Sequence, residues 1–371
     1  MSEERQESEA QSPLPEPTPS GLPAETEADP AAPRRQSIWR RLAVAIALLA
    51  ALAGAGYFGV WTLMPVSTDE KKVVIVEIPR NWGARRIADR LHERGLIRNR
   101  TAFLLAGHLL GDLQHLKAGE YELSPSMTPV EILDKLARGD VKAYWVTVPE
   151  GVTIKEIAAI FHKMRLIDPT RFVTLATRGG MRIGAEYGVP RKNLEGYLFP
   201  DTYKVPRAIT ERELIRIMVR SFHQQVERGL AQEIAERTNG LSLDETIVLA
   251  SLVEREARVT EERARIAGVL VNRLRRGMRL ECDATVQYAL GKTKERLLYS
   301  DLKVDSPYNT YLNSGLPPAP ICNPGLASIR AALKPEKHGY LFYVAVGTTG
   351  RHIFTRTFAE HKAAIRKVRG G

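Results

Sequence analysis

The sequence predicts an α+β protein with one membrane-spanning helix near its N-terminus. Three observations lead to this fold class. First, the segment Leu42–Met64 contains 23 residues without a charge. Second, short β-branched segments and amphipathic helical segments follow one another after it. Third, the C-terminal part has a series of helices, then a proline-rich loop, and then two strand-like segments.

The apolar segment predicts a membrane anchor. As a helix it spans roughly 34 Å at ~1.5 Å per residue, which is enough for a bilayer core. Four arginines lie between residues 34 and 41, whereas the charges after the segment balance, so the positive-inside rule places the N-terminus in the cytoplasm and exports the rest. A cleaved signal peptide is the alternative, because Ala51-Leu52-Ala53 resembles a cleavage site. We favour an uncleaved anchor, because a signal peptide has a shorter leader and a shorter apolar run.

Charge is distributed unevenly over the 371 residues, whose formal net charge is +11. Residues 1–33 contain eight acidic residues, one arginine and seven prolines, which predicts a disordered cytoplasmic tail with a charge of −7. The remaining residues therefore carry +18. Apart from the four arginines before the anchor, this basic part is exported, so we expect it to face anionic lipid and cell wall, and we exclude nucleic acid as a partner. Two cysteines exclude a disulfide-dense scaffold and a multi-cysteine zinc site.

The segments after the anchor predict a small domain over residues 70–142. Its strands and helices are expected at 72–79, 84–94, 100–110, 118–123 and 129–138. This pattern resembles a LysM-like domain, a module that binds glycans containing N-acetylglucosamine. A plain spacer domain is the alternative.

A mixed α/β region follows this small domain. We expect an intermediate subdomain over 143–240, with a strand at 144–148, helices at 153–164 and 211–237, and an aromatic, turn-rich run at 195–203. A catalytic subdomain over 241–371 has a helix that begins after Ser242, a short helix at 283–290 and strands near 341–346 and 352–355. With a tail over 1–36 and an anchor over 37–66, these ranges complete the predicted organisation.

One glutamate occupies an unusual position in the helix that follows Ser242. At 100° per residue, Glu254 falls between Ile247 and Ala250 in the apolar sector, whereas Glu256 falls on the more polar side. Burial is costly for an unpaired carboxylate and raises the pKa of a carboxyl, which suits a general acid. The alternative is a structural ion pair between Glu254 and Arg258, one turn further along the helix.

Polar and aromatic loops follow this helix. Asp283 opens a short helix, residues 306–311 read SPYNTY, and residues 315–325 read GLPPAPICNPG. Amide and hydroxyl groups match sugar hydroxyls, ring faces stack on sugar C–H surfaces, and prolines lower the entropy cost of binding. The alternatives are a capped turn in which Asn309 binds its own backbone, and a helix cap at Asp283.

Several long runs make the resemblance to a family specific. The sequence resembles the YceG/MltG family of membrane-anchored endolytic murein transglycosylases over roughly residues 70–368. The runs that carry this resemblance are EGYLFPDTY (195–203), LASLVEREA (249–257), VLVNRLRRGMRLECDATVQYAL (269–290), the SPYNTY and GLPPAPICNPG loops, and the final pattern that contains His352, Phe354, Thr357, Glu360 and His361.

The resemblance implies a reaction and a site. The family's catalytic glutamate is the first one of the run that here reads LASLVEREA, which is Glu254. The implied activity is a lytic transglycosylase that cleaves the MurNAc–GlcNAc β-1,4 bond within nascent strands and leaves 1,6-anhydro-MurNAc ends, so that strand length is limited. No cofactor is needed. Glu195 is the alternative acid, and the residues expected to line the glycan cleft are Asp283, Tyr308, Asn309, Thr310, Asn323 and Tyr197.

The same resemblance implies partners and a location. We expect a single-pass protein of the cytoplasmic (inner) membrane with its catalytic region outside, acting on peptidoglycan strands beside synthases and the division or elongation machinery. A non-catalytic scaffold that recruits wall synthases is the alternative. An aminodeoxychorismate lyase, a label attached to such sequences, would be a soluble pyridoxal-phosphate enzyme. The anchor and the lack of a recognisable cofactor-lysine motif argue against it.

Cysteines and histidines give two smaller predictions. Cys282 and Cys322 stand where family sequences often have small residues, and in an oxidising compartment we expect a disulfide between them, closing a ~40-residue loop. Two buried free thiols are the alternative. His352 and His361 lack metal-ligand spacing, so we expect structural or surface histidines and no metal site.

Overall fold

The computed structural model describes residues 32–292, 294 and 296–369, so most of the predicted tail lies outside it. The chain divides into two units at Thr62. The first unit is helix α1 (Ala32–Thr62), in which Trp39–Thr62 is long and apolar enough to cross a membrane. Its apolar side chains from Leu42 to Val60 are exposed, as lipid contact requires. The helix begins before the predicted end of the tail at residue 36.

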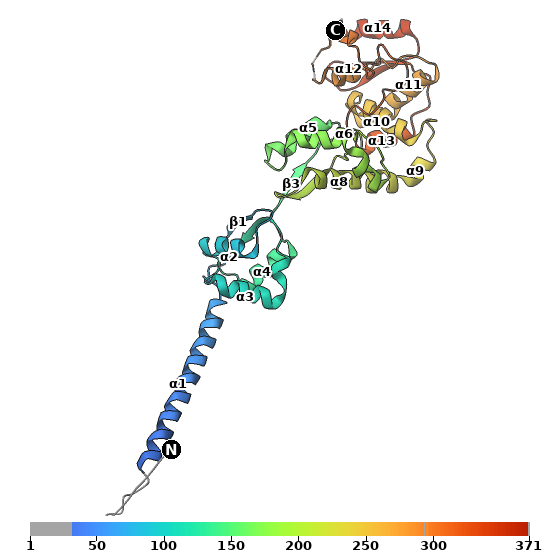
Figure 1. The fold of residues 1–371 in the computed structure, drawn as a ribbon. Coiled ribbons are helices and arrows are strands. Elements are labelled where there is room, and N and C mark those ends of the chain that lie inside the picture. Colours follow the sequence, from blue (N-terminus) through green and yellow to red (C-terminus); the bar gives the residue numbers. More distant parts are fainter. Residues whose placement is uncertain (1–31, 293, 295, 370–371) are drawn as a thin grey trace, which may run out of the picture. The chain divides into compact units, whose positions relative to one another are not determined.

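The second unit begins with a small β-α-α-β arrangement followed by a helix (Figure 1). Strands β1 and β2 pair antiparallel, with Val76 opposite Tyr121. A separate hydrophobic core lies beneath this pair and includes Phe103. All five predicted segments are confirmed within three residues: β1 (Val74–Ile78), α2 (Ala84–Glu93), α3 (Arg100–Leu110), β2 (Gly119–Leu123) and α4 (Pro129–Arg138).

The next segment contains a second antiparallel pair of strands and several helices. Its elements are β3 (Ala143–Thr147), α5 (Ile154–Lys163), α6 (Pro169–Arg178), α7 (Gly180–Gly184), β4 (Thr202–Pro206) and α8 (Glu211–Phe222). The predicted single helix over 211–237 is wrong. The chain continues from α8 into a π-helical turn over His223–Arg228, where the amide of Gly229 donates to the carbonyl of Gln224. This bond skips one residue relative to an α-helix, and only the short α9 (Ala231–Ala235) follows.

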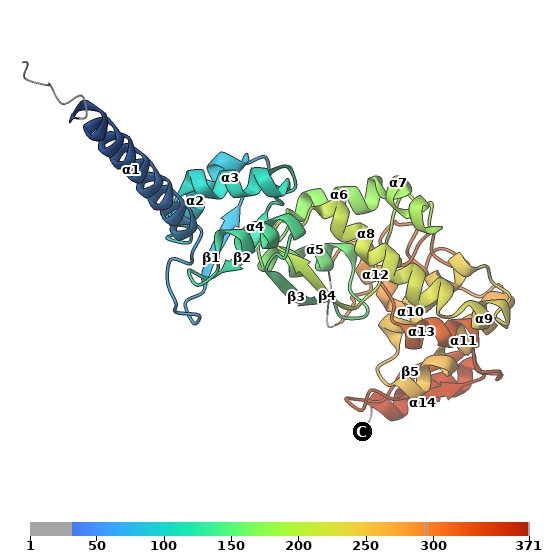
Figure 2. The same ribbon diagram turned by 90° about the horizontal axis from the view of Figure 1, so that it is seen from below.

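The C-terminal segment surrounds helix α10 (Leu243–Glu256). Helices α10, α11 and α13 lie side by side in both ribbon views (Figures 1 and 2). The third antiparallel pair of strands, β5 with β6, confirms the two strands predicted near the C-terminus. The remaining elements are α11 (Arg263–Arg275), α12 (Asp283–Leu290), α13 (Leu326–Leu333), β5 (Phe342–Ala345), β6 (His352–Thr355) and α14 (Phe358–Arg369).

One hydrophobic core joins the two segments after residue 142. It contains Phe161 and Phe222 from before the predicted boundary at 240, and Leu252 and Ile329 from after it. Helices and three antiparallel two-stranded sheets are mixed along the described chain, in agreement with the predicted mixture of helices and strands. The shared core fixes the loops of one segment against the helices of the other, and the candidate site lies where they meet.

Candidate functional site

Helix α10 carries the two glutamates on which the site depends. Ser242 and Glu245 form a capping box, in which the Ser242 side chain accepts from the Glu245 amide and the Glu245 carboxylate accepts from the Ser242 amide. This confirms the predicted start of the helix. Every residue from Thr246 to Val253 is buried, so the helix is enclosed on all sides. Its last turn therefore holds Glu254 and Glu256 in fixed directions, roughly 200° apart around the helix axis.

Glu254 is enclosed and has two partners. Its side chain is 6% exposed. Oε2 accepts a hydrogen bond from the amide of Gly325 at 2.9 Å, and Oε1 lies 3.3 Å from Nη2 of Arg263. The shielded environment agrees with the helical-wheel analysis. The cation is Arg263 of α11, however, rather than Arg258, the partner proposed under the ion-pair alternative.

Arg263 is itself held in place. Nε donates to Oγ of Ser328 at 3.0 Å, and Nη1 donates to Oγ1 of Thr260 at 2.9 Å. Its side chain is only 13% exposed. Three neighbours thus fix the guanidinium plane, and this in turn fixes the orientation of the Glu254 carboxylate.

A second carboxyl lies beside Glu254 and was missed in the sequence analysis. Glu150 is in the loop between β3 and α5, and a Cβ atom at Gly325 would collide with its carboxyl group. Burial raises the pKa of Glu150, the charge of Glu254 raises it further, and Arg263 lowers it. The motif PEG around Glu150 follows a strand that we predicted, but no local pattern brings it to Glu254, about a hundred residues later in the sequence.

Asn323 holds together the loops around this carboxyl pair. Its Oδ1 accepts from the amides of Gly196 and Leu198, each at 3.0 Å, and its Nδ2 donates to the carbonyl of Val152 and to Glu195, each at 3.0 Å. The side chain is 0% exposed. The prediction that Asn323 lines a glycan cleft is therefore wrong for this structure, because all its polar atoms are used inside the protein.

Glu195, the alternative acid, faces the same interior network. It is 4% exposed and accepts from the amide of Ile154, at the start of α5, at 3.0 Å. Burial raises the pKa of Glu195 to about 8, against hydrogen bonds that lower it. A carboxyl enclosed and bonded in this way supports the loops. It also lines a cavity of about 290 Å³ together with Arg255 and Tyr288.

Two further predicted cleft residues are buried. Asn309 and Thr310 are 0% and 1% exposed. Asn309 donates to the carbonyls of Leu302 and Val304, and Thr310 accepts from the amide of Cys282 at 3.0 Å. The prediction of direct sugar contact is wrong for both in this structure, and the capped-turn alternative describes Asn309 better.

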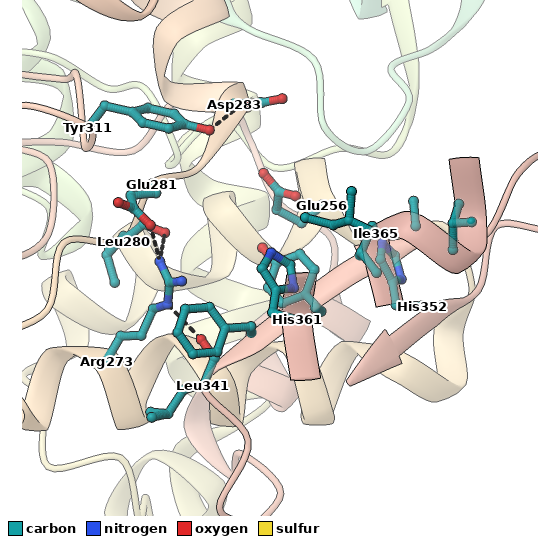
Figure 3. Close-up of a pocket in the computed structure, with 15 residues that line it drawn as sticks. Glu256, Arg273, Leu280, Glu281, Asp283, Tyr311, Leu341, His352, His361 and Ile365 are labelled. Carbon is teal, nitrogen blue, oxygen red and sulfur yellow. Dashed lines mark hydrogen bonds and ion pairs between the residues drawn. The ribbon is translucent and has the colours of Figure 1, made fainter. Parts of the chain in front are cut away.

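Glu256 projects into an open cavity of about 450 Å³ (Figure 3). Beside it, Tyr311 donates to Asp283 at 2.5 Å, and Arg273 pairs with Glu281 at 3.0 Å. Burial raises the pKa of Glu256 to about 7, and the charge of Asp283 adds to this effect. The helical pattern correctly gave Glu256 a different face from Glu254, but it did not reveal this cavity.

The other predicted cleft residues differ in exposure. Asp283 is exposed, lines the cavity of Glu256, and is the first residue of α12 rather than its cap. Tyr308 is half-buried with its ring 4.9 Å from that of Tyr288. Tyr197 is 3% exposed and donates to Asp244 at 2.6 Å, so it is a core residue. Asp283 and Tyr308 thus remain available to a ligand.

The predicted disulfide is wrong. Cys282 and Cys322 are free thiols, 1% and 0% exposed. Each sulfur contacts a different backbone carbonyl, that of Leu280 for Cys282 and that of Ser251 for Cys322. Burial raises the pKa of both thiols.

His352 is a structural histidine, as predicted. Its side chain is 5% exposed and its Nδ1 lies 2.7 Å from the carboxylate of Glu262. His361 stacks on Phe342 with a ring separation of 5.1 Å. Over the part of the chain that the structure describes, no group of three or more His, Cys, Asp or Glu side chains has metal-binding geometry.

Comparisons with known proteins give consistent results. The YceG-like family matches residues 76–367. An endolytic murein transglycosylase of Bacillus subtilis is 36% identical over 331 residues, which cover 85% of this chain and 90% of that protein. One from Streptococcus pneumoniae is 29% identical over 349 residues, 85% of this chain and 63% of that longer protein. A crystal structure of a YceG-like protein from Listeria monocytogenes has a TM-score of 0.55 at 33% identity, covering 79% of this chain and 99% of that one.

Proposed function

Because the chain belongs to the YceG-like family, we propose that it is an endolytic murein transglycosylase that cleaves peptidoglycan glycan strands. The observation that carries this proposal is the match to the Bacillus subtilis enzyme, which extends over 90% of that protein's length. The chain is thus a lytic enzyme, a lyase, rather than a non-catalytic scaffold. The family match covers both the small β-α-α-β domain and the segment that contains Glu254.

We infer that Glu254 is the catalytic acid and base. In a lytic reaction the C6 hydroxyl of the muramic acid attacks its own C1, so water and a covalent intermediate are not needed and one carboxyl can serve both steps. Glu254 first protonates the glycosidic oxygen and then removes the proton from the C6 hydroxyl. The product has a 1,6-anhydro-MurNAc end. Arg263 and the Gly325 amide support this role, because they hold the carboxylate in one orientation.

The glycan contacts that we propose lie around the last turn of α10. Asp283 is exposed beside Glu256, and Tyr308 presents part of its ring, so a carboxylate and an aromatic face are available to sugar hydroxyls and C–H surfaces. Arg255 is exposed between the two glutamates. A strand that crosses Arg255 would reach the surroundings of both. The buried Asn309, Thr310 and Asn323 support the loops that carry these contacts.

The small domain and the anchor suggest how the enzyme meets its substrate. The β-α-α-β order of residues 70–142 supports a LysM-like glycan-binding role, with a spacer as the alternative. The apolar span Trp39–Thr62 and the arginines before it support a single-pass inner-membrane protein with an exported catalytic region. We expect its partners to be nascent strands and the synthases that make them.

The proposal is tested by digesting purified sacculi with the full-length protein in detergent. Mass spectrometry of the soluble products should show anhydro-ended fragments longer than single disaccharides. Glu254→Gln should lower their release by roughly a hundredfold or more, because the acid and the base are lost together. Glu261→Gln is the matched control, because it removes a nearby but exposed carboxyl.

Two outcomes would contradict the proposal. If the wild-type protein releases no anhydro-ended fragment but still binds sacculi, the scaffold alternative replaces the enzyme. If Glu254→Gln releases as much product as the wild type, Glu254 has no part in the reaction. An unchanged melting temperature of the variant separates loss of chemistry from loss of fold.

A further inference from the structure

We propose that Glu150 is a positioning residue of the same site, whose carboxyl acts through Glu254 during proton transfer. This inference rests on the proposed function, since it concerns the residue that we assign as the acid and base. Nothing in the sequence pattern singled out Glu150. The observation that carries the inference is that two glycines, Gly151 and Gly325, leave room for the Glu150 carboxyl next to that of Glu254.

Two glycines bring Glu150 and Glu254 together. Gly325 has φ −82° and ψ 170°, a backbone conformation that any residue can adopt. A Cβ atom there would nevertheless collide with the Glu150 carboxyl, while the amide of the same residue donates to Glu254. Gly151 follows Glu150, has φ +78°, and a Cβ atom there would lie 3.4 Å from Cγ of Glu254. Both carboxyl groups therefore meet at the first turn of α13.

The charges around the pair are unbalanced. Arg263 of α11 forms the ion pair with Glu254. The guanidinium of Arg255 on α10 donates to the carbonyl of Gly151 at 3.3 Å and so points to the backbone of the Glu150 loop. Behind the loop, Glu195 and the thiol of Cys322 are buried. Two carboxyl groups thus lie beside one guanidinium, which pairs directly with Glu254.

Exposure gives the two carboxyl groups different tasks. Glu150 is exposed, whereas only 6% of the Glu254 side chain is exposed. Glu150 can therefore exchange protons with solvent. Its carboxyl lies beside the one that we assign as the acid and base, so it can pass protons between solvent and Glu254. Partial burial and the charge of Glu254 raise the pKa of Glu150, as expected for two carboxyl groups in one place.

The first test replaces Glu150 by glutamine in the full-length enzyme. Glu150→Gln should lower kcat roughly tenfold or more with little change in KM, because the charge acts on proton transfer and not on glycan binding. The pH–activity profile should also change, because the variant lacks the titrating carboxyl of Glu150 beside the acid and base. A merely structural residue would leave the pH profile in place. Glu261→Gln is again the control.

The second test uses the glycine that accommodates Glu150. Gly325→Ala should displace the Glu150 carboxyl and lower kcat in a similar way, although all charges are kept. In a Glu150→Ala background the same change should have little further effect, because the colliding carboxyl is gone. Non-additivity of this kind ties the effect of Gly325→Ala to Glu150 rather than to the fold of α13.

The results can overturn the inference without overturning the proposed function. If Glu150→Gln keeps the wild-type kcat and pH profile while Glu254→Gln is inactive, Glu150 has no role and the transglycosylase proposal stands. Fully additive effects of Gly325→Ala and Glu150→Ala would also contradict the inference. If the wild type itself produces no anhydro ends, the proposed function fails first.

Discussion

The last turn of α10 contains two glutamates whose surroundings differ completely. The Glu254 side chain is almost fully shielded from solvent. It forms an ion pair with Arg263 and accepts a hydrogen bond from the amide of Gly325, and Glu150 lies beside it. Glu256, two residues later, projects into a cavity of about 450 Å³ near Asp283, where its pKa is raised to about 7. Within one helix turn, one glutamate is held by an ion pair, and the other is desolvated at the wall of a cavity, where burial raises its pKa.

This difference teaches that two common signs of a catalytic carboxyl need not coincide. The resemblance to the family led us to propose Glu254 as the acid and base, and its partners fix its orientation. The raised pKa and the cavity, which also mark functional carboxyl groups, belong to Glu256. We regard Glu254 as the acid and base and the Glu256 side as room for the glycan. Three experiments test this division, in order of decreasing effect.

Replacing Arg263 by methionine should have the largest effect on stability. It leaves Glu254 without its cation in a site where only 6% of the side chain is exposed, and breaking a buried pair costs about 3–5 kcal/mol. Urea unfolding at pH 7 should show a loss of this size, together with loss of activity. The exposed pair of Arg216 and Glu186 is the control, and Arg216→Met should cost far less, because solvent screens this pair. Equal costs at both sites would mean that the Glu254 side is not closed.

Glu256→Gln should have a smaller effect, and one that depends on pH. The folded protein binds this proton up to a pH of about 7, the unfolded chain only up to about 4.5, so the stability from Glu256 falls as the pH rises through this window. Wild type should therefore lose up to about 3 kcal/mol relative to the variant between pH 4.5 and pH 8.

Urea unfolding of both proteins at the two pH values measures this difference. If their stabilities change in parallel, Glu256 does not hold the proton. Sacculus digestion gives a second readout, in which Glu256→Gln should raise KM and lose far less turnover than Glu254→Gln. A complete loss of turnover in Glu256→Gln alone would reverse the assignment of the two glutamates.

The two cysteines should give the smallest effect. Cys322 lies in the loop that leads to Gly325 and contacts the carbonyl of Ser251 in α10, whereas Cys282 precedes Asp283 near the cavity of Glu256. Reducing agent should not change the unfolding midpoint, because no disulfide is formed. Alkylation without reductant should modify both thiols after unfolding and neither before, which mass spectrometry detects. A single species lacking both modifications after unfolding would show the disulfide after all.

Local patterns predicted most of the secondary structure. Strands β5 and β6, the capping box at Ser242 and the helices of the small domain all follow from nearby residues. The helix over 211–237 was predicted incorrectly, because a π-turn adds one residue per turn without changing the amphipathic composition. Periodicity also placed Glu254 and Glu256 on different faces.

The site was harder to predict because its contacts join distant segments. Arg263 reaches Glu254 only after the chain reverses between α10 and α11, and Glu150 arrives from another subdomain. Asn309 and Asn323 have side chains suited to sugars, but the same amides satisfy buried backbone groups here. Residue type alone does not distinguish these uses, since the number of backbone groups left to satisfy depends on the tertiary fold.

The position of Asn323 late in the sequence affects when the site can form during synthesis of the chain. Its one side chain bonds to the segments at Val152, Glu195, Gly196 and Leu198. The loop around Glu150 therefore lacks these hydrogen bonds until residue 323 has been synthesised. A chain that ends before residue 323 would thus lack the contacts that fix this loop, so the arrangement of Glu150 and Glu254 can form only when most of the sequence has been made.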